Sequence, residues 1–107
     1  MAVKYYHKLV RDLIPDIIHK SGSICKTRVL EHEEYLLMLE TKLQEEMQEY
    51  LSDKSMEEMA DLMEVIRAVV AARGHTMDEV ERIRIEKKQK RGGFDKRILL
   101  EEVESHD

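Results

Sequence analysis

The sequence predicts an all-α fold, an antiparallel helical bundle built on a helical hairpin. Its 107 residues include four Gly and one Pro, too few for the turns of a many-stranded sheet. Five aromatic residues and no Trp leave the core to Leu, Ile, Val and seven Met. Apolar residues also recur at three- and four-residue steps, the period of an amphipathic helix. At this length we expect a single domain over residues 1–107.

The first two helices are predicted from Pro, Gly and apolar spacing. A short helix is expected within residues 5–21, with Pro15 in its first turn and Gly22 as its C-terminal cap. The loosely alternating residues 24–30 favour an extended segment only weakly. From about Glu33 to Leu51 the apolar spacing predicts a long amphipathic helix.

A polar break at residues 52–55 separates this helix from a second one that continues to about Arg73 and is stopped by Gly74. So short a connection predicts that the two helices return antiparallel, as a hairpin. Thr76, three residues before Glu79, predicts a capping box that opens a third helix to about Lys90, which Gly92 and Gly93 end. Residues 98–103 are expected to form either a short strand or a docking tail.

Charge and composition limit the partners. The formal net charge of −5 argues against a nucleic-acid binder, which needs a basic surface. No stretch is long and apolar enough to span a membrane, and the lone Cys25 gives no internal disulfide. We therefore expect a cytoplasmic protein.

Six carboxylates lie on the two helices of the predicted hairpin: Glu45, Glu46, Glu49, Glu57, Glu58 and Asp61. Glu46 and Glu49 are three residues apart, so they share a helix face, and the same holds for Glu58 and Asp61. A hairpin folded between residues 53 and 54 brings Glu46 level with Asp61. The same fold brings Glu49 level with Glu58, so that four carboxylates converge.

Crowded carboxylates repel unless a cation lies among them. Oxygen ligands suit Mg²⁺ or Mn²⁺ better than zinc, and a Mg²⁺ site suggests a phosphorylated substrate. Acid pairs at this spacing also occur on solvated helix faces, and Glu58, three residues after Ser55, also fits a capping box. The matched registers favour the metal site, but the spacing alone leaves both interpretations open.

Three blocks of the sequence resemble a known family. Residues 45–49 (EEMQE) and 58–61 (EMAD) resemble the EExxE…ExxD signature of the MazG-like all-α nucleoside triphosphate pyrophosphohydrolases. Residues 8–12 (KLVRD), followed by Ile14 and Pro15, and residues 91–94 (RGGF) are similar to a small branch of it, labelled phosphoribosyl-ATP pyrophosphohydrolase-like. The resemblance extends over nearly the whole chain.

The resemblance implies a Mg²⁺-dependent enzyme, with Mn²⁺ as a possible substitute. Such an enzyme cleaves the linkage between the α- and β-phosphates of a nucleoside triphosphate, or of phosphoribosyl-ATP, to a monophosphate and pyrophosphate. The implied metal ligands are Glu46, Glu49, Glu58 and Asp61. Glu45 is then a further ligand or the group that orients or deprotonates the attacking water. Members of the family are dimers or larger, and these helices leave apolar surface over, so a homodimer is expected.

The substrate phosphates also need cations. The resemblance favours Lys87 and Arg91, one helical turn apart, although cations in a last turn also simply stabilise the helix end. Lys8 and Arg11 belong to the N-terminal block and are candidate substrate contacts, while Arg11 alternatively pairs with a charge across a subunit boundary. The other function that we consider is a non-catalytic helical homodimer that binds a nucleotide or a protein partner. The presence of all five acids of the signature favours the enzyme.

Overall fold

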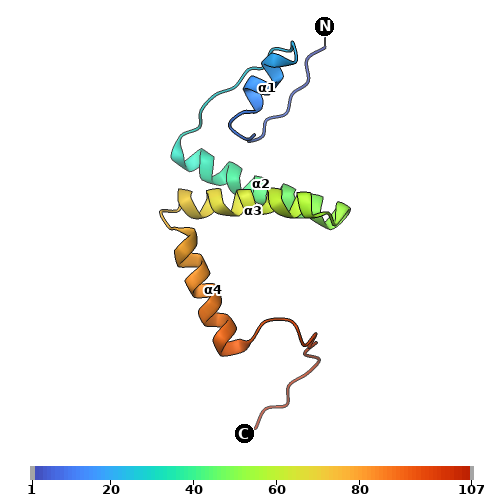
Figure 1. Cartoon of the computed structure of the whole chain (residues 1–107), viewed down its shortest axis with the longest axis vertical. Coiled ribbons are helices and arrows are strands. Elements are labelled where there is room, and N and C mark those ends of the chain that lie inside the picture. The colour runs from blue at the N-terminus through green and yellow to red at the C-terminus, as the bar shows by residue number, and fades with distance from the viewer. Residues whose placement is uncertain (1, 107) are drawn as a thin grey trace. The chain divides into compact units, whose positions relative to one another are not determined.

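A computed structural model describes residues 2–106 and consists of four helices (Figure 1). They are α1 (Ile14–Lys20), α2 (His32–Asp53), α3 (Met56–Ala72) and α4 (Met77–Arg91). No strand occurs among the described residues, so the predicted all-α class is confirmed. By its internal contacts the chain divides into two compact units, one ending at His75 and the other beginning at Thr76. The single domain over residues 1–107 stays a prediction.

The predicted hairpin is formed by α2 and α3, which pack side by side in antiparallel directions (Figure 1). The chain reverses at Lys54, whose φ of 63° lies in the left-handed region. Ser55 then caps α3, and its Oγ accepts a hydrogen bond from the Glu58 N–H at 3.2 Å. The polar break that we placed at residues 52–55 is therefore shorter, because α2 continues through Asp53 and one left-handed residue suffices to end it.

The interior of the hairpin is narrow. Leu39 of α2 and Val65 of α3 are the buried apolar residues among those described, with 4% and 8% of their surface exposed. At the end of the hairpin opposite the turn, Arg73 pairs with Glu40 and ties the two helices together. The packed interface between α2 and α3 is therefore narrow, and much of the apolar surface of both helices lies outside it.

Five large apolar side chains of the hairpin are exposed: Leu37, Met47, Leu51, Met56 and Met63. Met56 and Met63 lie two helical turns apart and so share one face of α3. A helical hairpin with a second apolar face of this kind lacks a partner for that face within its own unit. We call these five residues the exposed apolar face.

Helix α1 begins as its sequence predicts, with Pro15 in the first turn, where a missing N–H leaves no bond unmade. Ser21 caps its end and Gly22 follows with a φ of 94°, the left-handed conformation that glycine adopts easily. Residues 24–30 form no strand. The N-terminal segment is nevertheless anchored to the hairpin, because Arg28 donates two hydrogen bonds to Glu34, at 2.9 and 2.6 Å.

The second unit begins with the predicted cap: Thr76 Oγ1 accepts a hydrogen bond from the Glu79 N–H at 3.2 Å. Helix α4 ends at Gly92, whose φ is 84°, and every residue from Val80 to Arg91 is exposed. Residues 98–103 are irregular, so the short strand that we considered there does not form. In the described part of the chain, no helix has both the length and the apolar content that a membrane crossing requires.

Candidate metal centre

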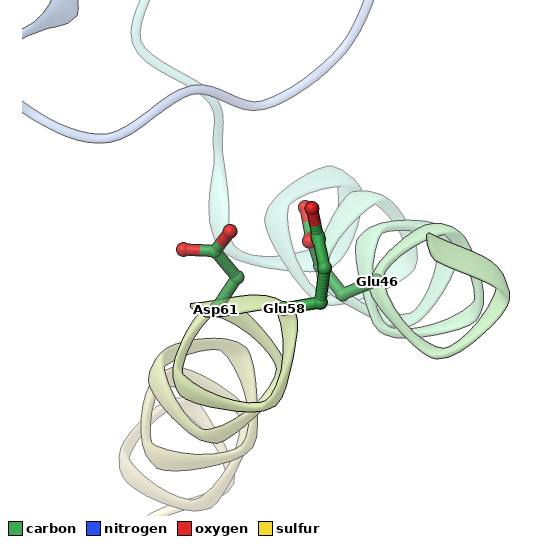
Figure 2. Close-up of side chains that lie close together, drawn as sticks. All are labelled: Glu46, Glu58 and Asp61. Atoms are coloured by element: carbon green, nitrogen blue, oxygen red, sulfur yellow. The ribbon is translucent and has the colours of Figure 1, made fainter. Parts of the chain in front are cut away.

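Three of the four predicted metal ligands meet near the turn of the hairpin. Glu46 comes from α2, and Glu58 and Asp61 come from the first two turns of α3. Figure 2 shows their carboxylates on the same side of the two helices. One oxygen of each lies within 4.8 Å of one oxygen of both others. We call this group the acid triad.

The spacing of the acid triad fits a small divalent cation after a short adjustment. Three atoms at most 4.8 Å apart all lie within about 2.8 Å of some common point, and Mg²⁺ binds oxygen at about 2.1 Å. Side-chain movements below 1 Å therefore bring all three oxygens to bonding distance. All three donors are carboxylate oxygens, the ligands that Mg²⁺ and Mn²⁺ prefer. The residues present thus fit such an ion in both geometry and chemistry.

The carboxyl group of Glu58 has a raised pKa. Partial burial raises its pKa, and the negative charges of Glu49, Asp61, Asp53 and Glu46 raise the pKa further. A carboxyl group with a raised pKa gains from a nearby cation, because the cation offsets the repulsion that disfavours its charged form. The site is therefore arranged to favour binding of positive charge.

The other two predicted acids lie beside the triad. Glu49 is exposed and is not one of the three clustered carboxylates, although its charge is the largest electrostatic contribution to the raised pKa of Glu58. Glu49 lies about 60° around the helix from Glu46 at 100° per residue. Glu45 is half-exposed, with its Oε2 atom 3.8 Å from Lys42 Nζ. The metal-binding role of Glu49 and the action of Glu45 on water stay predictions.

Two cations contact the acid triad. Arg11 Nη2 donates a hydrogen bond of 2.8 Å to Asp61 Oδ1, which brings the N-terminal block to the site within the same chain. Lys42 Nζ lies 3.3 Å from Glu46 Oε1. Sequence reasoning missed Lys42, although its position four residues before Glu46 is a signal for such a pair. Lys8 is exposed, with its Nζ 5.8 Å from the centre of the Tyr6 ring.

The predicted phosphate-binding pair, Lys87 and Arg91, belongs to the second unit. There the two side chains line an open pocket of about 690 Å³ together with Arg84, Lys88, Gly92, Gly93, Phe94 and Asp95. Arg84 also pairs with Glu81 of the same helix, which lowers the pKa of that carboxyl. Lys88, which we did not select from the basic run, lines the same pocket. The pocket concentrates positive charge at the C-terminal end of α4.

The blocks on which the family resemblance rests are thus distributed over both units. The two acidic blocks form the turn end of the hairpin, and Arg11 of the N-terminal block contacts them. The RGGF block ends α4. Comparisons of the chain with protein-family models, with curated proteins and with solved structures find no match.

Proposed function

We propose that this protein is a Mg²⁺-dependent nucleotide pyrophosphohydrolase that cleaves between the α- and β-phosphates of a nucleoside triphosphate or of phosphoribosyl-ATP. The observation that carries the proposal is the convergence of Glu46, Glu58 and Asp61 from two helices. A solvated acidic face needs no such convergence, whereas a divalent ion does. The sequence resemblance supplies the reaction class.

The residues divide the work between binding and proton transfer. Glu46, Glu58 and Asp61 would hold the ion, and Glu49 would be the fourth ligand that the resemblance implies. A bound Mg²⁺ offsets the negative charge of the phosphates and lowers the pKa of a coordinated water. Glu45 accepts the proton of the attacking water. The water oxygen bonds to phosphorus, the bond to the bridging oxygen breaks, and a monophosphate and pyrophosphate leave.

We further propose that the protein is a homodimer that covers the exposed apolar face of each hairpin with that of a second copy. A face with five large apolar side chains is unfavourable in water, and two such hairpins together make a four-helix arrangement with a closed core. This proposal concerns assembly and stands apart from the metal chemistry.

The test is a panel of nucleoside and deoxynucleoside triphosphates and phosphoribosyl-ATP, each incubated with Mg²⁺ and scored for pyrophosphate release. Glu58→Gln should reduce turnover of the best substrate by orders of magnitude. Glu57→Gln is the matched control, because it removes the same charge from the adjacent, exposed position of α3. Its turnover should stay within a few fold of the unsubstituted chain.

Two results would contradict the proposal. The first is the absence of pyrophosphate release from every substrate in the presence of Mg²⁺. The second is near-full activity of Glu58→Gln. Nucleotide binding without any turnover would instead support the non-catalytic dimer.

A further inference from the structure

The pocket at the C-terminal end of α4 gathers cations on one face of that helix. Four basic side chains line it: Arg84, Lys87, Lys88 and Arg91. Their spacing places all four within an arc of about 100° around the helix, at 100° per residue. Lys90 lies about 60° beyond this arc, and it does not line the pocket. We call the four residues the basic stripe.

The stability of α4 does not explain the basic stripe. Like charges four residues apart destabilise a helix, and the stripe contains two such pairs, Arg84 with Lys88 and Lys87 with Arg91. The helix dipole favours cations in the last turn, but Arg84 precedes that turn. Arg84 pairs with Glu81, whereas the other three cations form no ion pair within the described part of the chain. Their position fits an anionic ligand instead.

The charge of the pocket stays positive when its acids are counted. Asp95 lines the pocket, and Glu81 lies against Arg84. Four cations against these two carboxylates leave a balance of two positive charges. The basic stripe extends over seven residue steps, which is about 10.5 Å along the helix axis. A chain of two or three phosphates matches this length better than a single phosphate does.

An aromatic ring lies beside these charges. Phe94 is the one Phe of the chain; it lines the same pocket and is 97% exposed. The turn that carries it is closed by the Arg97 N–H, which donates a hydrogen bond of 3.1 Å to the Phe94 carbonyl oxygen. The cation–π contacts of the described residues involve Tyr6 and Tyr50, so no cation covers the Phe94 ring. An open ring next to unpaired cations fits a ligand that has both a base and phosphates.

The backbone between the basic stripe and Phe94 is open to such a ligand. A Cβ atom at Gly92 would meet no atom within 4 Å, and one at Gly93 would lie 3.6 Å from Lys88 Cε. The N–H groups of Gly93 and Phe94 form no backbone hydrogen bond within the described residues. A phosphate can therefore approach these two donors without meeting a side chain at either glycine.

We propose that this pocket binds a nucleotide with two or more phosphates and does so without a divalent ion. The basic stripe holds the phosphates, and Phe94 stacks on the base. The pocket volume of about 690 Å³ lies within the range of about 300–1,000 Å³ that is typical of small-molecule sites. The net charge of −5 argues against a nucleic-acid strand as the ligand. The inference goes beyond the proposed function, because it needs neither the acid triad nor a metal.

The experiment measures dissociation constants by isothermal titration calorimetry in the presence of EDTA. The two probes are ATP and inorganic tripolyphosphate, which has the phosphates but no base. The unsubstituted chain should bind both. Phe94→Leu should weaken the binding of ATP about tenfold, as expected for the loss of one base–aromatic stack, and should leave tripolyphosphate binding unchanged. Phe94→Tyr keeps the ring and should bind ATP as the unsubstituted chain does.

A second pair of variants tests the basic stripe. Lys87→Met should weaken the binding of both probes at least about tenfold, because it removes a charge-assisted contact with the phosphates. Lys90→Met is the matched control, since it removes the same charge from the same helix outside the basic stripe. It should leave both dissociation constants unchanged. Lys87, Lys90 and Phe94 are all exposed, so these variants should fold, which circular dichroism checks.

Several results would overturn the inference. One is the absence of ATP binding at millimolar concentration in EDTA. Another is a Phe94→Leu variant that binds ATP normally or that loses both probes equally. Equal losses in Lys87→Met and Lys90→Met would show attraction by net charge alone, and a single-stranded DNA oligonucleotide that binds more tightly than ATP would assign the pocket to nucleic acid. Pyrophosphate release with Mg²⁺ is a separate measurement, so the failure of either proposal leaves the other standing.

Discussion

Replacing Asp61 with Asn removes one negative charge from the acid triad and keeps the shape of the side chain. At the Mg²⁺–oxygen distance of about 2.1 Å, the attraction between a double and a single charge is about 4 kcal/mol even in the dielectric of bulk water. The amide oxygen of the Asn restores part of this attraction. We therefore expect the affinity for Mg²⁺ to fall about 100-fold, which corresponds to about 2.8 kcal/mol. The weaker binding should appear as a smaller stabilisation of the folded protein by Mg²⁺.

The assay is urea unfolding with and without Mg²⁺ at about 100 times the dissociation constant of the unsubstituted chain. Under these conditions the ion stabilises that chain by about 2.7 kcal/mol and Asp61→Asn by only about 0.4 kcal/mol. The exposed ion pair with Arg11 is lost as well, and such pairs contribute about 0–1 kcal/mol. That loss affects both conditions and cancels in the increment due to Mg²⁺.

Glu64→Gln is the control, because Glu64 lies on the same helix, is exposed and is not part of the triad. It should keep the full increment. The reasoning would be refuted if Asp61→Asn were stabilised by Mg²⁺ as strongly as the unsubstituted chain, or if Glu64→Gln lost the increment to the same degree.

Three further outcomes are expected. Partial burial and neighbouring carboxylates raise the pKa of Glu58, so the folded, metal-free protein binds this proton more tightly than the unfolded chain does. The free energy of unfolding should therefore fall as the pH rises from the ordinary carboxyl pKa through the raised pKa of Glu58. Urea unfolding over a series of pH values should show that Glu58→Gln removes this part of the pH dependence. Met63→Lys places a charge in the exposed apolar face, so light scattering should show monomers at concentrations where the unsubstituted chain is dimeric; an unchanged mass would contradict the dimer. Arg91→Ala removes a charge-assisted contact of about 1.5–3 kcal/mol. Steady-state kinetics should therefore show a KM for nucleotide that is at least tenfold higher, with a smaller change in kcat. A fall in kcat alone would contradict a phosphate-binding role.

The helices could be predicted because their signals are local. Pro15, Ser55 and Thr76 act through hydrogen bonds and dihedral angles within a single turn, and all three begin or cap helices as expected. The convergence of Glu46 with Asp61 also followed from the sequence, because an antiparallel hairpin with a short turn allows few registers. Two details of the hairpin differ from the prediction. The turn is shorter, because Lys54 adopts the left-handed conformation without being a glycine, and three carboxylates converge rather than four.

The contact of Arg11 with the site could not be predicted in this way, because it depends on packing between distant segments. Arg11 reaches Asp61 across 50 positions of the sequence, and no local period encodes such a contact. The pair of Lys42 with Glu46 is local, four residues apart on α2, and the prediction missed it although the spacing was available. Glu49 differs from Glu46 by a rotation of about 60° on the helix, at 100° per residue. The angle at which the hairpin packs decides which of two such neighbours joins the cluster.

Helix α4 has no buried residue and no packed face within its own unit. Its 15 residues are close to the length at which an isolated helix is only marginally stable in water, so we expect its last turn to fray unless a ligand or partner holds it. An anion that contacts both Lys87 and Arg91 would fix one turn of the helix. The conformational entropy that this turn loses makes the free energy of binding less favourable. Binding at this end of the protein should therefore weaken on warming more steeply than binding at the hairpin, whose backbone is ordered in advance.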